Sequence, residues 1–282
     1  MPFEVLDSLS IPGNPEKQNE DAFACADNAA VVMDGATGVG DQLLPGKSDA
    51  AWVSQFGVRR LLAHIKQGET AQGAVKAALS DTQSSFIGLA RRPPAETYEK
   101  PFASMMFVVE SADGFDALWY GDCAALVKRQ GEPVIVIGEA FDKRAQEAAR
   151  VAKLAAKIGI APAAAANREE FLPALRKARN YVNTVEGAYL FGPDIIAADH
   201  VAMKRVHAPK GTIVLLATDG FLAAASDYGL YDAEGLVQAA QEKGLQAIGA
   251  EIRALEDSDP TGERFARFKK SDDTTAMLLK VS

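Results

Sequence analysis

Apolar runs of strand length in this chain repeatedly begin or end at carboxylates, and this pattern constrains the fold more than any other feature. The residues concerned are Glu20-Asp21 before DAFACA, Asp34 after AAVVM, Asp122 after ALWY, Asp219 after TIVLLAT, and Asp272-Asp273 before TTAMLL. A single Asp-Gly pair at a strand end usually forms a turn. Strand ends that share one edge of a sheet would instead bring these carboxylates together.

Carboxylates gathered at one place repel one another strongly unless a cation lies between them. The chain contains three His and two Cys, and Cys25 and Cys123 lack the spacing of zinc ligands. An oxygen-rich set of ligands is typical of Mg²⁺ and Mn²⁺ sites. Gly35, directly after Asp34, has no side chain and would let its carbonyl oxygen approach a metal. Two such ions about 3.5–4 Å apart can activate a water that attacks a phosphorus centre.

The composition is that of an ordinary globular protein and argues against several classes of partner. Of 282 residues, 48% are hydrophobic and 24% are charged, which allows one large domain or two small ones. The net charge of -8 argues against binding to nucleic acids or anionic membranes. No apolar run approaches the roughly 20 residues of a membrane helix, and the start of the sequence does not resemble a signal peptide. We therefore expect a cytoplasmic protein with no nucleic-acid and no membrane partner.

The spacing of apolar residues predicts the order of strands and helices. Helical spacing is found over about 49–65, 70–89 and 233–255, and strand-like runs precede, separate and follow these segments. Asp27-Asn28 and Asp113-Gly114 predict the turns of two hairpins. Because strands and helices do not alternate regularly, the pattern favours an α+β fold with mostly antiparallel sheets.

Five motifs in this order resemble those of one enzyme family. NEDA, VMDGATG, YGDCA, LLATDGF and SDDTTAMLL occur in the order and approximate spacing found in the metal-dependent Ser/Thr protein phosphatases of type 2C, the PPM family. The resemblance extends from Asn19 to Leu279 and is of the kind seen in divergent bacterial members. It implies one domain over residues 1–282, an αββα sandwich of two antiparallel β-sheets flanked by helices, and a site for two Mn²⁺ or Mg²⁺ ions at one end.

The resemblance also implies roles for individual residues. Asp34 would bridge the two ions and Asp21 would orient a metal-bound water, so these two are the candidate catalytic residues. The other candidate metal ligands are Glu20 and the Gly35 carbonyl for one ion, Asp219 and Asp272 for the second, Asp273 as the second choice in the last motif, and Asp122 for a third ion. Asp272 is preferred because Asp272-Asp273-Thr274-Thr275 matches the family pattern Asp-Asn-x-Thr/Ser without a gap.

The chain departs from the family pattern where the substrate and a third ion would bind. Glu16 stands where family members usually carry an arginine that grips the substrate phosphate, and the adjacent Lys17 lacks the bidentate fork of arginine. Ala223 replaces an Asp that helps to bind a third ion, so a third ion has less support than the first two. Cys123 replaces the usual Ser, and we expect it to be a small buried residue.

A basic segment over residues 141–181 offers another source of phosphate contacts. It contains nine Lys and Arg against four Asp and Glu, in a chain of net charge -8. It could be a solvated helical pair that packs on the sandwich, or an inserted helical flap over the acidic site. In the second case the candidate phosphate ligands, besides Lys17, are Arg144, Arg150, Arg168, Arg176 and Arg179.

The sequence therefore predicts a metal-dependent phosphomonoester hydrolase, and the resemblance implies phosphoserine or phosphothreonine in proteins as its substrate. Two alternatives remain open. The altered phosphate grip is compatible with a phosphatase of small phosphomonoesters. A regulatory binding module that keeps the fold but has weak catalysis would be expected to lack metal ligands, whereas the main ligands are present here.

Overall fold

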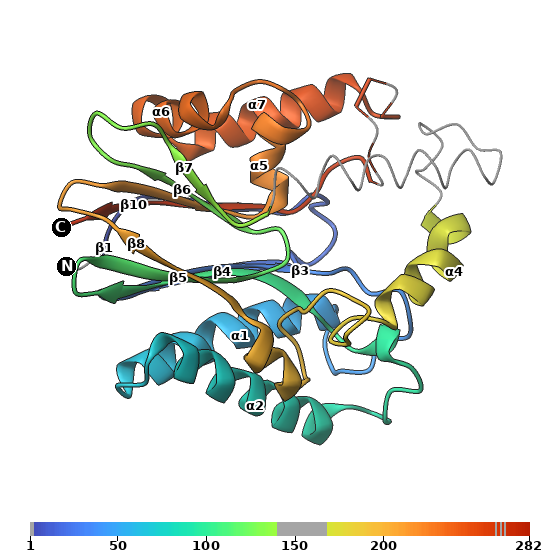
Figure 1. Cartoon of the computed structure of the whole chain (residues 1–282). Helices are drawn as coiled ribbons and strands as arrows, with labels where there is room; N and C mark the ends of the chain where they lie inside the picture. The colour runs from blue at the N-terminus through green and yellow to red at the C-terminus, as the bar shows by residue number, and fades with distance from the viewer. Residues whose placement is uncertain (1–2, 140–167, 263, 266, 268) are drawn as a thin grey trace.

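Two five-stranded antiparallel sheets pack face to face, and helices cover the outer face of each (Figure 1). The computed structural model describes residues 3–139, 168–262, 264–265, 267 and 269–282. This arrangement confirms the predicted α+β class and the αββα sandwich. The first two residues and 140–167, which include most of the predicted basic segment, lie outside the described residues.

Every strand pairing in the two sheets is antiparallel. Sheet A contains, in spatial order, β1 (Phe3–Ile11), β10 (Thr274–Val281), β9 (Ile213–Ala217), β6 (Ala124–Lys128) and β7 (Ile135–Ile137). Sheet B contains β2 (Asp21–Ala26), β3 (Ala29–Gly35), β4 (Ala103–Ser111), β5 (Gly114–Tyr120) and β8 (Ala202–His207). Neighbours in space are often far apart in sequence, so the first and last strands of the chain pair with each other.

The helices form the two outer layers (Figure 1). The helix bounds are α1 (Asp49–Lys66) and α2 (Ala71–Leu89) on sheet B, α5 (Asp219–Ser226), α6 (Ala233–Lys243) and α7 (Leu245–Ser258) on sheet A, and α4 (Arg168–Arg179) at one end of the sandwich, with short 3-10 turns η1 (Thr97–Glu99) and η3 (Ile195–His200). Among the described helices, none is long and apolar enough to cross a membrane.

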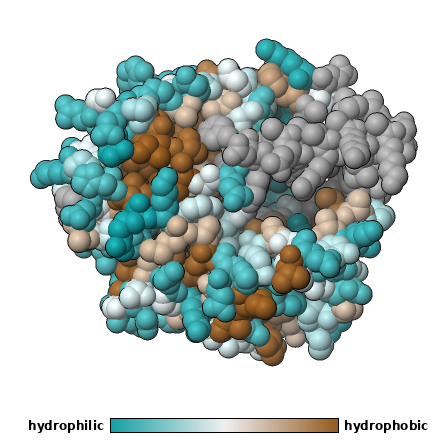
Figure 2. Space-filling model, in the orientation of Figure 1, coloured by the Kyte–Doolittle hydropathy of each residue, from teal (hydrophilic) through white to brown (hydrophobic). Residues whose placement is uncertain are grey.

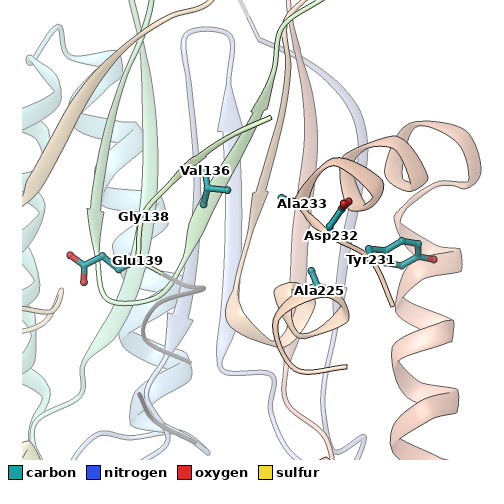
Figure 3. A pocket seen from close by; sticks show the side chains of 7 residues that line it. All are labelled: Val136, Gly138, Glu139, Ala225, Tyr231, Asp232 and Ala233. Carbon is teal, nitrogen blue, oxygen red and sulfur yellow. The ribbon is translucent and has the colours of Figure 1, made fainter. Parts of the chain in front are cut away.

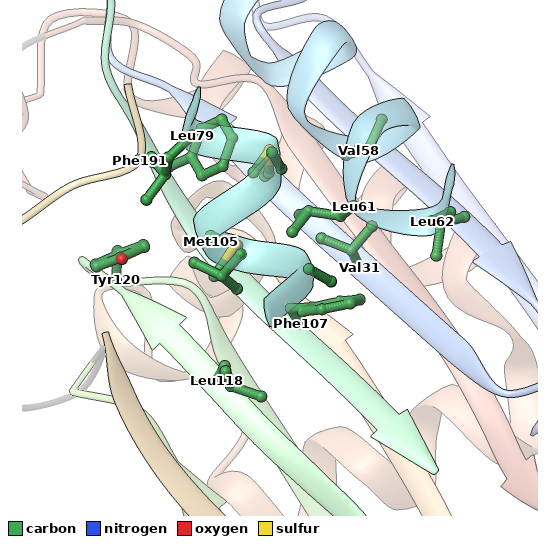
Figure 4. Close-up of a cluster of buried hydrophobic side chains, with 14 of the residues drawn as sticks. Val31, Val58, Leu61, Leu62, Leu79, Met105, Phe107, Leu118, Tyr120 and Phe191 are labelled. Atoms are coloured by element: carbon green, nitrogen blue, oxygen red, sulfur yellow. The ribbon is translucent and has the colours of Figure 1, made fainter. Parts of the chain in front are cut away.

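Apolar side chains fill the space between each pair of layers. Val32 and Met106 of sheet B meet Leu216 and Met277 of sheet A between the sheets. A second cluster, which includes Phe107, packs sheet B against α1 and α2 (Figure 4). A strand such as β3 is thus buried on both faces, which explains its almost unbroken apolar sequence. On the face drawn in Figure 2, the remaining apolar areas are separated by hydrophilic side chains.

Several predicted elements match the structure, and some boundaries differ. α1, α2 and the hairpin turn at Asp27-Asn28 are confirmed, while the second hairpin turns at residues 112–113, one residue early. The segment predicted as one helix over 233–255 is two helices, because Gly244 adopts a left-handed φ of +83° between them. α5 and β8 were not predicted. Each is short, and four of the six β8 residues are exposed, so their apolar patterns are weak.

The chain crosses from sheet B to sheet A at Gly121 and Asp122, the latter one of the predicted acidic residues. The run FDALWYGDCAALV is split by the structure into β5 in sheet B and β6 in sheet A. Gly121 makes this crossing with a left-handed φ of +71°. Asp122 follows it and therefore lies between the ends of the two sheets rather than inside a strand.

We expect Gly121→Ala to destabilise the protein more than Gly131→Ala. Both glycines have a left-handed φ, +71° and +75°, so either alanine costs about 1–2 kcal/mol of backbone strain. At Gly121 the new Cβ would also lie 2.1 Å from the Ser104 hydroxyl, whereas at Gly131 no described atom lies within 4 Å. Such overpacking typically costs a further 1–3 kcal/mol or so. Urea unfolding of both variants measures the difference, and equal losses would contradict the steric argument.

Candidate metal centre

Strand order in the two sheets brings the predicted acidic residues to one end of the sandwich. In sheet B, Asp21 at the start of β2 pairs with Asp34 near the end of β3. In sheet A, β10 begins just after Asp273 and runs antiparallel to β9, which ends just before Asp219. The start of one strand therefore lies beside the end of its neighbour in both sheets, as antiparallel pairing requires.

Burial and repulsion both act on Asp34. Burial is the larger cause that raises the pKa of Asp34 well above its ordinary value. Repulsion from neighbouring carboxylates raises it further, and these neighbours are Asp219, Asp21, Asp272 and Asp122. We call these residues, together with Asp34 and Asp273, the carboxylate cluster. A buried group of like charges favours either protonation or a bound cation.

Asp21 is the member of the cluster whose two carboxylate oxygens differ most in their hydrogen bonding. Burial raises its pKa well above the ordinary value, a hydrogen bond from Thr218 opposes this, and repulsion from Asp272, Asp273 and Asp219 adds to it. Asp21 Oδ2 accepts that hydrogen bond from Thr218 Oγ1 at 2.8 Å. Its other oxygen, Oδ1, is buried and accepts no hydrogen bond from any described residue. A buried carboxylate oxygen without a partner is costly and fits a site that receives a cation or its water ligand.

The surroundings of Gly35 and Glu20 are tightly organised. A Cβ at Gly35 would lie 2.6 Å from the carbonyl oxygens of both Glu20 and Ala50, so glycine is required there. The Glu20 carboxylate accepts hydrogen bonds from the hydroxyls of Thr37 and Ser48, the latter at 2.6 Å. Glu20 is thus held at the rim of the cluster by two neutral donors, which could yield one of its oxygens to an ion.

The structure separates the two aspartates of the last motif. Asp273 Oδ1 accepts a hydrogen bond from Gly13 N and its Oδ2 accepts one from Glu20 N, both at 2.7 Å. Asp272 Oδ1 accepts a hydrogen bond from Asp273 N at 2.8 Å and forms an ion pair with Lys269. Asp273 therefore links the N-terminal segment to the start of β10. Asp272 instead pairs with the ammonium of a lysine, which a metal ion could replace.

Asp122 and Cys123 lie at the crossing between the sheets. Asp122 Oδ1 accepts a hydrogen bond from Ser104 Oγ at 2.6 Å. Cys123 is fully buried, as expected, and burial, then Asp34 and Asp122, raises its pKa well above the ordinary value. A thiol of this kind is a weak nucleophile, because the thiolate is the reactive form.

Two of the predicted phosphate ligands contact the loop that follows Gly35. Arg176 Nε donates to Val39 O at 2.7 Å, and its guanidinium lies 5.3 Å from the centre of the Tyr98 ring. Arg179 Nη1 donates to Thr37 O at 2.9 Å. Thr37 also donates to the Glu20 carboxylate. Arg179 at the end of α4 is therefore connected through Thr37 to Glu20, a candidate metal ligand.

The remaining predicted phosphate ligands are Lys17, Arg144, Arg150 and Arg168. Lys17 is exposed on the N-terminal segment. Arg144 and Arg150 lie outside the described residues, and only the backbone of Arg168, at the start of α4, is described.

Four residues that support the cluster were not anticipated from the sequence. Thr218 precedes α5, and its hydroxyl joins Asp21 of sheet B to the backbone N–H of Thr275 in sheet A. Arg253 of α7 donates to Asp272 O at 2.7 Å, Ser104 holds Asp122, and Lys269 pairs with Asp272. A sequence signal exists for Thr218, inside LLATDGF, and for Lys269, three residues before the acidic pair.

The carboxylate cluster gathers acidic side chains without bringing three of them to a single point. Within the described ranges, no three Asp, Glu, His or Cys side chains converge closely enough to hold a metal. A cavity of about 540 Å³ lies elsewhere, between β7, the end of α5 and the start of α6, and its described lining includes no carboxylate of the cluster (Figure 3). The donor set, its burial and the partnerless Asp21 oxygen nevertheless fit a hard divalent cation better than any other common group.

One family model matches most of the chain, and solved structures share its fold. The family model described as protein phosphatase 2C matches residues 15–255. The structure is similar to the serine/threonine phosphatase PstP/Ppp of Mycobacterium tuberculosis, with a TM-score of 0.59, 16% identity and complete coverage of both chains. A search by sequence among curated proteins finds no match.

Two further solved structures have the same fold. The catalytic domain of the phosphatase PstP in complex with two manganese ions gives a TM-score of 0.56 and 16% identity, over 100% of this chain and 99% of that one. The PPM phosphatase MsPP of Mycobacterium smegmatis gives a TM-score of 0.56 and 18% identity, over 99% of both chains.

We expect Asp34→Asn to stabilise the metal-free protein at neutral pH. A carboxyl whose pKa is raised on folding stabilises the folded state below its ordinary pKa of about 4, and this contribution is lost as pH rises through the raised pKa. The wild type should therefore lose stability with rising pH, and the advantage of the variant should grow in the same direction.

Urea unfolding in EDTA at a series of pH values measures this difference. Asp116→Asn, which weakens an ion pair with Arg205 away from the cluster, is the matched control and should not stabilise the protein. An Asp34→Asn variant that is less stable than the wild type at neutral pH would show that the cluster is not electrostatically strained.

Proposed function

The chain belongs to the protein phosphatase 2C family of metal-dependent protein phosphatases, and we propose that it hydrolyses phosphoserine and phosphothreonine esters with two Mn²⁺ or Mg²⁺ ions as cofactors. One relative of the same fold, PstP, has been solved with two manganese ions, which supports a pair of ions in this chain too. A cytoplasmic location and a single domain over residues 1–282 remain predictions.

The carboxylate cluster is the observation that carries the proposal. It gathers oxygen ligands from four strand ends of two sheets, its members are buried or partly buried, and Asp21 Oδ1 has no hydrogen-bond partner among the described residues. When bound there, two divalent ions would polarise the phosphoryl group and activate a water for attack on phosphorus. No cysteine or histidine nucleophile is needed for such a reaction.

The proposal assigns roles to the candidate ligands in and beside the cluster. Asp34 experiences repulsion from both sheets, from Asp21 and from Asp219, and is therefore the best placed to be shared between two ions. Asp219 and Asp272 would complete one ion's ligands from sheet A, and Glu20 with the Gly35 carbonyl would complete those of the other.

Asp21 would act on the nucleophile rather than on an ion directly. Thr218 occupies its Oδ2 and fixes the orientation of the carboxylate, so Oδ1 is left to accept a proton or hydrogen bond from a water in the site. Asp122 has less support as a ligand of a third ion, because Ala223 on α5 provides no second carboxylate.

We expect hydrolysis of p-nitrophenyl phosphate and of a phosphothreonine peptide to require Mn²⁺ or Mg²⁺. The ligand set is made of oxygens, so removal of divalent ions by EDTA should abolish turnover and added Mn²⁺ should restore it. Sugar and nucleotide phosphates measured in parallel distinguish a small-molecule phosphatase. Full activity in EDTA would contradict the proposal. Metal binding without turnover would favour the binding-module alternative.

We expect Asp272→Ala and Asp273→Ala to have different effects. Asp272→Ala removes a ligand and should weaken Mn²⁺ binding by roughly tenfold or more, since a charge-assisted contact is typically worth about 1.5–3 kcal/mol. Asp273→Ala leaves the N–H groups of Gly13 and Glu20 without their acceptor, so it should mainly lower the free energy of unfolding. Calorimetric Mn²⁺ titration and urea unfolding of both variants test this, and the reverse ranking would refute the ligand assignment.

A further inference from the structure

A phosphate ester has to approach an acidic site, and its negative charge must be balanced there. Glu20 and the aspartates 21, 34, 219 and 272 carry five negative charges when ionised, whereas two divalent ions supply four positive charges. The loaded site is therefore still slightly negative before a phosphate dianion binds. An additional cation beside the cluster would favour phosphate binding by direct attraction.

Lys269 is such a cation. It lies three residues before Asp272, and its Nζ forms an ion pair with Asp272 Oδ1. A lysine has an ordinary pKa of about 10.4, so the ammonium is charged at neutral pH. Its side chain is 45% exposed, so the ammonium is accessible from solvent at the edge of the cluster.

Its neighbour Lys270 has a different environment. Lys270 Nζ forms an ion pair with Asp257 at 2.5 Å, and both side chains are more than half exposed. Asp257 belongs to α7 and is not a member of the cluster. The two adjacent lysines therefore provide a test residue and a matched control of the same chemical type.

Other described cations near the cluster already bind the backbone, and Arg253 donates to the Asp272 carbonyl. Arg176 and Arg179 donate to the carbonyl groups of Val39 and Thr37. On the N-terminal segment, Glu16 is exposed and carries the wrong charge for a phosphate ligand. Lys269, by contrast, pairs with Asp272, a candidate metal ligand. Its ion pair therefore depends on whether Asp272 binds a metal ion.

We propose that Lys269 is a phosphate-binding residue of this site, released for the substrate when Asp272 turns to a metal ion. The inference rests on the proposed function. A divalent ion attracts a carboxylate more strongly than a monovalent ammonium does, so metal loading frees Nζ from Asp272. The flexible four-carbon stem then leaves an ammonium with three donors beside the place where a metal-bound phosphate would lie.

This arrangement has two opposite consequences for Lys269→Met. In the metal-free protein, Lys269 competes with metal for Asp272, so the variant should bind Mn²⁺ as tightly as the wild type or more tightly. In the metal-loaded protein, loss of the ammonium should weaken binding of phosphate. A residue with a merely structural role would weaken both.

The experiment is calorimetric titration of Mn²⁺ into the wild type, Lys269→Met, Lys269→Arg and Lys270→Met, followed by titration of inorganic phosphate into each Mn²⁺-saturated protein. For Lys269→Met we expect phosphate affinity to fall roughly tenfold without a loss of Mn²⁺ affinity. Lys269→Arg should retain most of the phosphate affinity, and Lys270→Met should change neither titration. In turnover of p-nitrophenyl phosphate, Lys269→Met should raise KM more than it lowers kcat.

Two results would overturn the inference alone: unchanged phosphate affinity and KM in Lys269→Met, or a parallel loss of Mn²⁺ and phosphate affinity in that variant. A wild type that binds no Mn²⁺ would overturn the proposed function, and the role of Lys269 with it. The two failures are therefore distinguishable in the first titration.

Discussion

Mutual repulsion among buried carboxylates is the constraint on which the rest of this structure depends. Folding places Asp34 within the field of four other aspartates and removes much of the water that would screen them. Hydrogen bonds from hydroxyl groups, such as that from Thr218 to Asp21, offset part of this cost, and the ion pair of Lys269 with Asp272 offsets another part. A hard divalent cation would offset far more, which is why the same cluster is best understood as a metal centre.

The sandwich itself supplies the means of building such a cluster. Antiparallel neighbours place the start of one strand beside the end of the next, so two sheets can bring several strand ends to one edge of the molecule. The crossing at Gly121 adds Asp122, and the contacts of Thr218 with Asp21 and Thr275 join the two sheets at this edge. The apolar layers behind the cluster hold these strand ends in fixed positions, because close-packed cores resist small displacements.

Much of this could be predicted from the sequence by itself. The two hairpins, α1, α2, the antiparallel α+β class and the positions of the acidic residues at strand ends are local properties, encoded by apolar periodicity and turn residues. The break at Gly244 and the short elements α5 and β8 were missed, because a few residues of weak pattern gain their structure from packing rather than from local preference.

The sequence by itself determined which residue types stand at the strand ends, and hence that oxygen ligands outnumber all others in this chain. The tertiary structure alone decided how neighbouring residues differ in role. Asp272 and Asp273 are adjacent and chemically identical, yet one binds two backbone N–H groups and the other a lysine ammonium. Asp273 meets Gly13 and Glu20, segments more than 200 residues away in the sequence, whereas Asp272 meets Lys269 only three residues away. Which side chain faces which partner therefore depends on how the chain folds back on itself.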